Sequence, residues 1–117
     1  SVIVVLCRSA EEEVRDTAVR ALGMLGGHRP GSCFGPEQRV RVFETMMEAT
    51  RDPLPAIRAK AVRGLGKMAA AGLLGGEPRE RTRKRIDQVL GRQETYAWDQ
   101  AYIVRKEAEE ALEAFGG

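Results

Sequence analysis

The chain has 117 residues, of which 43% are hydrophobic and 31% charged, and its formal net charge is +2. This length predicts one domain, and the balance of apolar and charged residues excludes a disordered tail and gives no overall sign of a nucleic-acid-binding protein. The apolar opening, residues 2–6, is far shorter than the roughly 18 residues that a membrane-spanning helix needs. We therefore expect a soluble protein in the cytoplasm.

Three segments of the chain resemble one another. They are 9-SAEEEVRDTAVRALGML-25, 52-DPLPAIRAKAVRGLGKM-68 and 99-DQAYIVRKEAEEALEAF-115. Val14, Ile57 and Val104 align at spacings of 43 and 47 residues, and each is followed by Arg, by Ala four residues on and by Leu eight residues on. Offsets of four and eight place these apolar residues on one stripe of a helix. A fixed period of about 20 to 50 residues is typical of repeat architectures.

Each of these helices has an expected partner upstream. Residues 36–50 begin with Pro36 and carry an apolar face, and residues 77–90 carry Pro78 in their first turn, as helix starts often do. In the first unit, residues 2–8 take this place. Their β-branched run is a poor helix former, so we predict a helix there only from the alignment, and a short strand is the alternative.

Turn residues separate the paired helices, and glycine-rich loops separate the units. The turns are 51–55 and 95–100, and the loops are 26–36 and 72–78, with the Gly and Pro content that ends helices. The order is thus helix, turn, helix, loop, three times over. We expect one all-α domain with units at about 1–27, 36–71 and 77–117, and we expect this chain to be a piece of a longer protein.

This pattern resembles the HEAT repeat family, an armadillo-type α-solenoid, over nearly the whole chain. The family's spacing of six residues from Asp to Arg occurs twice, and Ser9 takes the Asp position in the first unit. The resemblance implies a right-handed α-α superhelix of about three helical hairpins, the first one truncated. It also implies a ladder of hydrogen bonds between units, which would fix their register. The ladder residues would be Asp52, Arg58, Asp99, Arg105 and Arg15.

No residue pattern points to catalysis or to a cofactor. His28 is the only histidine and stands in a glycine-rich loop, so we expect a solvated side chain. Cys7 and Cys33 form no CxxC pair, and we expect two reduced thiols, Cys7 buried and Cys33 in a loop, with no metal site. The glycines of 64-GLG-66 follow no strand, which disfavours a phosphate-binding loop.

The resemblance implies that the second helix of each unit lines a concave face, the surface that solenoids use for binding. The side chains directed away from the apolar stripes of these helices are Arg20, Lys60, Arg63, Lys67, Glu109, Glu110 and Glu113. They are either ordinary solvated charges or a groove that changes sign along its length and binds a protein of complementary charge. We expect a non-catalytic scaffold module, with self-association through exposed solenoid ends as a further option.

Two other features are candidates for binding. The run 79-RERTRKR-85 is the densest basic cluster; it is either a solvated face or a site for a phosphate-rich partner. The aromatic residues Tyr96, Trp98 and Tyr102 gather around the last turn, either as local packing or as an anchor for a partner.

Two alternative functions share the repeat pattern. A group of DNA glycosylases has a HEAT-like fold with a continuous basic groove, and Glu109, Glu110 and Glu113 would interrupt such a groove here. HEAT-like lyases that attach or modify chromophores are a third option, and no residue of this chain distinguishes them. The protein-binding module is the leading hypothesis.

Overall fold

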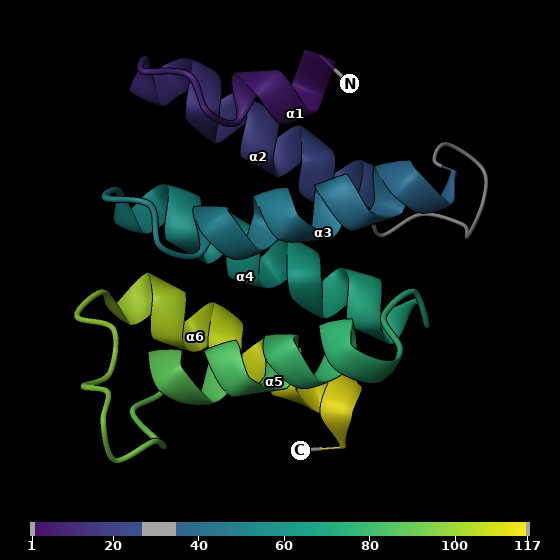
Figure 1. Cartoon of the computed structure of the whole chain (residues 1–117). Coiled ribbons are helices and arrows are strands. Elements are labelled where there is room, and N and C mark those ends of the chain that lie inside the picture. The colour runs from purple at the N-terminus through teal and green to yellow at the C-terminus, as the bar shows by residue number, and fades with distance from the viewer. Residues whose placement is uncertain (1, 27–34, 117) are drawn as a thin grey trace.

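The computed structural model describes residues 2–26 and 35–116, and in these residues the chain is helical without strands (Figure 1). The helices are α1 (Val2–Leu6), α2 (Glu12–Gly26), α3 (Pro36–Ala49), α4 (Pro55–Ala70), α5 (Gly76–Val89) and α6 (Tyr102–Ala111), and α6 continues as the 3₁₀ helix η1 (Leu112–Phe115). The expected all-α class is therefore confirmed. The strand alternative for residues 2–6 is wrong.

The start of each second helix follows a common rule. Helices α2, α4 and α6 begin three residues after Ser9, Asp52 and Asp99, respectively. In each case the side-chain oxygen of that residue accepts a hydrogen bond from the backbone N–H two residues later, at 3.1, 2.9 and 2.9 Å. Such local bonds stabilise a turn and not a helix. The first three residues of each repeated segment therefore form the turn that leads into the helix.

Consecutive helices form pairs that lie side by side in chain order (Figure 1). The helices α2, α4 and α6 lie in one layer, where α4 packs against both neighbours, and α1, α3 and α5 lie in front of them. Close backbone contact is extensive along the α2/α4/α6 layer and far sparser between α3 and α5. The six helices form one body of 36 × 32 × 20 Å.

The core consists of two apolar clusters that meet at α4. One lies among α1 to α4 and includes the fully buried Leu22 and Met46; the other lies among α4, α5 and α6 and includes Ile86 and Val104. Of the nine aligned apolar positions in the three repeated segments, all are buried except Val14, which is half-buried. Burial of these stripes is the main stabilisation that such amphipathic helices obtain.

Small residues set the spacing of the α2/α4/α6 layer. A Cβ atom on Gly64 would lie 2.9 Å from the Cα of Gly23 in α2, and one on Gly66 would lie 2.8 Å from the Cβ of Ala111 in α6. Both distances are too short for real atoms, so α4 approaches its two neighbours only because these positions carry no side chain. The glycines of 64–66 are thus packing residues on two sides of one helix.

Candidate partner-binding surfaces

Two Arg–Asp pairs connect successive helical pairs. Arg15 donates from Nε and Nη2 to the two carboxylate oxygens of Asp52, at 2.8 and 3.1 Å. Arg58 donates in the same way to Asp99, at 2.8 and 3.0 Å. The side chains of Arg58 and Asp99 are only 16% and 9% exposed. The structure therefore places four of the five expected ladder residues in two equivalent, well-shielded contacts.

Each arginine also holds the turn before its own helix. The Nη1 group of Arg58 donates to the backbone carbonyls of Asp52 and Pro53, at 2.9 and 3.1 Å. Arg15 donates likewise to the carbonyl of Ser9, at 3.2 Å. Ser9 forms the same turn in the first unit but is uncharged. It therefore cannot form the carboxylate contact that Asp52 and Asp99 form with arginine.

The surroundings of the two aspartates favour their anionic forms. Burial by itself would raise the pKa of Asp52, but the hydrogen bonds from Arg15 and from the Leu54 N–H, together with the nearby guanidinium charges, lower that pKa below its ordinary value. The pKa of Asp99 is lowered for the same reasons, with Arg58 as the side-chain donor. Both contacts are therefore charge-assisted at neutral pH.

Arg105 occupies the third equivalent position. Its Nη1 donates to the backbone carbonyl of Asp99 at 2.7 Å, as Arg58 does to that of Asp52. Within the described residues no carboxylate forms an ion pair with it. Its guanidinium carbon lies instead 4.2 Å from the ring centre of Trp98 and 5.9 Å from that of Tyr102. These two side chains are 55% and 67% exposed. A cation and two exposed aromatic rings therefore lie together beside the start of α6.

The charges expected to line a concave face lie on the α2/α4/α6 layer, and some are paired across its helices. Lys60 of α4 contacts Asp16 of α2 at 2.5 Å, and Arg63 of α4 contacts Glu107 of α6 at 3.4 Å. The other five residues of that set are exposed and form no ion pair within the described part of the chain: Arg20, Lys67, Glu109, Glu110 and Glu113. Basic side chains remain free on α2 and α4, and acidic ones on α6.

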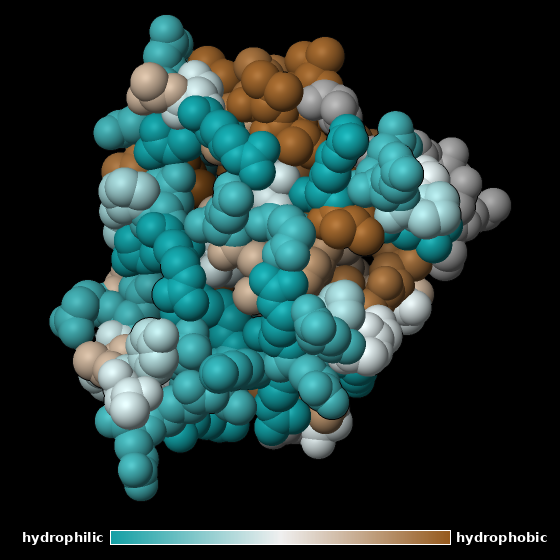
Figure 2. All heavy atoms as spheres, in the orientation of Figure 1, coloured by the Kyte–Doolittle hydropathy of each residue, from teal (hydrophilic) through white to brown (hydrophobic). Residues whose placement is uncertain are grey.

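The opposite end of the stack is apolar. Val2 and Val5 of α1 are 74% and 68% exposed, and Leu6 is exposed beside them. Figure 2 shows the corresponding gathering of hydrophobic atoms over α1, whereas hydrophilic atoms cover α5. The two ends of the described stack therefore differ in chemistry.

Four of the five basic side chains in the run 79–85 contact other groups of the chain. The pairs are Arg79 with the Ala114 carbonyl at 2.8 Å, Arg81 with Glu44 at 2.7 Å and Arg83 with Asp87 at 3.6 Å. Arg85 is the fourth and donates to Thr50 and Gln88. Together with Arg81 and Lys84 it lines a cleft of about 680 Å³ between α3 and α5. The run is thus not one uniform surface, because the helix distributes its members over different neighbours.

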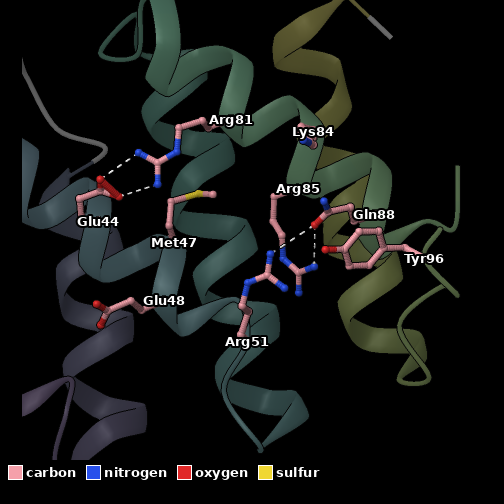
Figure 3. A pocket seen from close by; sticks show the side chains of 9 residues that line it. All are labelled: Glu44, Met47, Glu48, Arg51, Arg81, Lys84, Arg85, Gln88 and Tyr96. Carbon is pink, nitrogen blue, oxygen red and sulfur yellow. Dashed lines mark hydrogen bonds and ion pairs between the residues drawn. The ribbon is translucent and has the colours of Figure 1, made fainter. Parts of the chain in front are cut away.

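Figure 3 shows this α3/α5 cleft. The residues that line it are Glu44, Met47, Glu48, Arg51, Arg81, Lys84, Arg85, Gln88 and Tyr96. The side chains of Arg51 and Arg85 converge on the Gln88 carboxamide, and the hydroxyl of Tyr96 points toward the same place (Figure 3). Tyr96 therefore lines the cleft, whereas Trp98 and Tyr102 lie beside Arg105. Arg51 did not stand out in the sequence, because it lies in a turn outside the basic run.

The remaining reactive groups are few in the described residues. Cys7 is a buried free thiol, as expected, and burial raises its pKa to about 11 although Arg8 acts in the opposite direction. In residues 2–26 and 35–116 there is no group of three or more His, Cys, Asp and Glu side chains that could hold a metal ion. No helix in this part of the chain is long and apolar enough to cross a membrane. His28 and Cys33 lie outside the described residues.

No protein-family model matches this chain, and no curated protein or solved structure is significantly similar to it. Function must therefore be argued from the chain's own residues.

Proposed function

We propose that this chain is a non-catalytic protein-binding module, a short right-handed solenoid of HEAT-like helical hairpins. Three features support the proposal: the helical pairs follow one another in chain order, α4 packs between α2 and α6, and Arg15 and Arg58 contact the next pair in the same way. In this arrangement α2, α4 and α6 line the inner face. Stacked repeats of this kind present extended surfaces that suit protein partners.

The observation that carries the proposal is the state of Arg105. Arg15 and Arg58 each hold a carboxylate of the following pair, whereas Arg105 holds none among the described residues and lies against two exposed rings. A guanidinium beside aromatic side chains is typical of a protein-binding hot spot, because Arg, Trp and Tyr contribute most of the binding energy at many protein interfaces. The partner would supply a carboxylate to Arg105 and apolar atoms to cover Trp98 and Tyr102.

The exposed charges of the α2/α4/α6 layer give the partner an orientation. Arg20 and Lys67 are basic and lie on α2 and α4, whereas Glu109 and Glu110 are acidic and lie on α6. A partner along this face should carry acidic groups opposite α2 and α4 and basic groups opposite α6. Such complementarity acts mainly on specificity and on the rate of association.

Site-specific photo-crosslinking tests this proposal. A benzoylphenylalanine probe replaces Tyr102 at the anchor or Lys67 on the inner face, and a control probe replaces Arg39, an exposed residue of α3. We expect one protein partner to be captured from the source cell at positions 102 and 67 but not at 39. Capture only at 39, or of no protein at any position, would overturn the proposal.

The isolated partner then allows a quantitative test. Arg105→Glu should weaken its affinity at least about tenfold, because a like charge would meet the partner's carboxylate, whereas Arg39→Glu should leave the affinity unchanged. Adducts between two copies of this chain would identify self-association. Micromolar binding to duplex or single-stranded DNA with a steep salt dependence would instead favour the nucleic-acid alternative.

A further inference from the structure

The α3/α5 cleft holds positive charge that the described residues do not neutralise. No carboxylate forms an ion pair with Arg51, Lys84 or Arg85 in this part of the chain. The two carboxylates in the lining of the cleft are already engaged: Glu44 accepts two hydrogen bonds from Arg81, and Glu48 accepts two from Arg8. None of the three cations therefore forms an ion pair with a described carboxylate, and the largest anionic influence on Arg85 is the charge of Asp99, which is itself paired with Arg58.

The two arginines are held close together by a neutral group. Arg51 and Arg85 both donate to Oε1 of Gln88, at 3.4 and 3.1 Å. Arg85 is fixed further, since its Nε and Nη2 donate to the hydroxyl and the carbonyl of Thr50, at 3.1 and 3.0 Å. These bonds use three of the five N–H groups of the Arg85 guanidinium. Its position is thus set before any ligand arrives, and two donors remain.

The electrostatics of this arrangement favour an added anion. The pKa of Arg85 is lowered, first because burial removes water from the guanidinium and next because the charge of Arg51 lies nearby, although the Asp99 carboxylate acts in the opposite direction. Placing a half-buried cation beside a like charge is unfavourable, and a bound anion would relieve both effects. At Arg15 and Arg58, by contrast, a paired carboxylate compensates the charge of each shielded guanidinium.

We propose that the α3/α5 cleft is an oxyanion site that binds a single phosphate monoester group through Arg51, Lys84 and Arg85. A phosphate monoester carries nearly two negative charges and three acceptor oxygens near neutral pH, which suits three cationic donors better than the two oxygens and one charge of a carboxylate. Arginine forks match the geometry of phosphate oxygens. Glu44 and Glu48 in the cleft lining disfavour a long polyanion such as a nucleic acid. The site lies between α3 and α5 and does not depend on the proposed partner-binding function.

Isothermal titration calorimetry on the full chain tests this site with four probes of stated chemistry. They are inorganic phosphate, a short phosphoserine peptide, the same peptide with glutamate in place of phosphoserine, and duplex DNA. We expect phosphate and the phosphoserine peptide to bind, and the glutamate peptide to bind at least about tenfold more weakly, because charge-assisted contacts are lost with the third oxygen. Equal affinity for the phosphoserine and glutamate peptides would overturn the assignment to phosphate.

Variants of the two exposed cations connect the binding to the cleft. Arg51→Gln and Lys84→Gln should each lower the affinity for the phosphoserine peptide about tenfold, whereas Arg39→Gln at an exposed position of α3 should not. Thermal melting checks that each variant is folded, and Arg85 is left intact because it also holds Thr50. Binding that is unchanged in both cleft variants would place the phosphate elsewhere and overturn the proposal.

The probes also distinguish the source of the phosphate group. Equal affinity for inorganic phosphate and for the peptide would indicate a free ion or small metabolite as ligand. Tighter binding of the peptide would indicate a phosphorylated protein. If DNA binds more tightly than the peptide and the affinity falls steeply with salt, the cleft is a nucleic-acid site and the monoester proposal is wrong.

Discussion

Two interfaces join the same two helical pairs, the α4/α6 seam and the α3/α5 seam, and they differ in how completely their charges are paired. At the first seam, Gly66 lets the backbones approach closely, and the charges that this approach covers are paired, as in Arg58 with Asp99. At the second seam the helices make little backbone contact; Arg81 is paired with Glu44, but Arg51 and Arg85 form no ion pair within the described residues.

The difference follows from access to water. A charge that is shielded by close packing must be paired, because the loss of hydration is otherwise uncompensated. Where a cleft admits water, part of that hydration is retained, and unpaired cations can persist. The charges at the closely packed α4/α6 seam therefore stabilise the fold, whereas the unpaired cations at the open α3/α5 seam are available to bind an anion.

The largest expected effect comes from breaking the Arg58 contact. Arg58→Ala should lower the free energy of unfolding by roughly 1 to 3 kcal/mol, because it leaves the shielded Asp99 carboxylate without its donors. Urea denaturation measures this loss. Arg105→Ala is the control: it removes one backbone hydrogen bond and the contact with the Trp98 ring but no ion pair, and it should cost clearly less. Equal losses in the two variants would show that the carboxylate contact contributes little.

A second prediction concerns the approach of α4 to α6. Gly66→Ala should lower the free energy of unfolding by about 1 to 2 kcal/mol, since the overpacking against Ala111 outweighs the better helix propensity of alanine. Lys67→Ala on the exposed side of the same helix is the control and should have little effect. A Gly66→Ala variant more stable than the original chain would mean that this seam is not closely packed.

The paired aspartates predict a dependence of stability on pH. The pKa values of Asp52 and Asp99 are lower in the folded chain than their ordinary values, so the unfolded state binds protons first as the pH falls. Their contribution is full above the unfolded pKa of about 4 and is lost as the pH falls through the folded values. Urea denaturation between pH 6 and pH 2.5 should show this decline, and Asp99→Asn should reduce its slope. An identical slope in Asp99→Asn would contradict the prediction.

The smallest expected effect lies in the cleft. Arg51→Gln should change the free energy of unfolding by no more than about 0.5 kcal/mol, and any change should be stabilising because it removes repulsion from Arg85. Thermal melting at low salt, where this repulsion is least screened, gives the most sensitive measurement. If Arg51→Gln lowered the free energy of unfolding as much as Arg58→Ala does, the proposed difference between the two seams would be wrong.

Much of this fold can be predicted from local patterns. The apolar stripes and the turn residues are properties of short segments, so the helices and their order follow from residues only a few positions apart. The equivalence of Arg15, Arg58 and Arg105 is visible in the same way, because each follows an aligned apolar residue. Even the β-branched residues 2–6, which local propensity disfavours as helix, were assigned correctly from the repeat.

The binding surfaces could be predicted only in part. Residues 79–85 form one basic run in the sequence, but the helix divides them between intramolecular contacts and the cleft. Arg51 joins that cleft from a different helical pair, and no sequence pattern connects it with Arg85. Lys60 and Arg63 stand among the exposed charges of the expected inner face, although the structure pairs each with a neighbouring helix.

What the sequence determined by itself is the set of helices, their buried sides and the turns between them, since these depend on interactions within a few residues. Apart from the expected Arg–Asp ladder, which charges are paired and which are left open was decided only by the tertiary structure. The reason is physical: pairing and hydration depend on how closely helices from different units approach, and that distance is set by small residues such as Gly66 and Ala111, which are far apart in the chain.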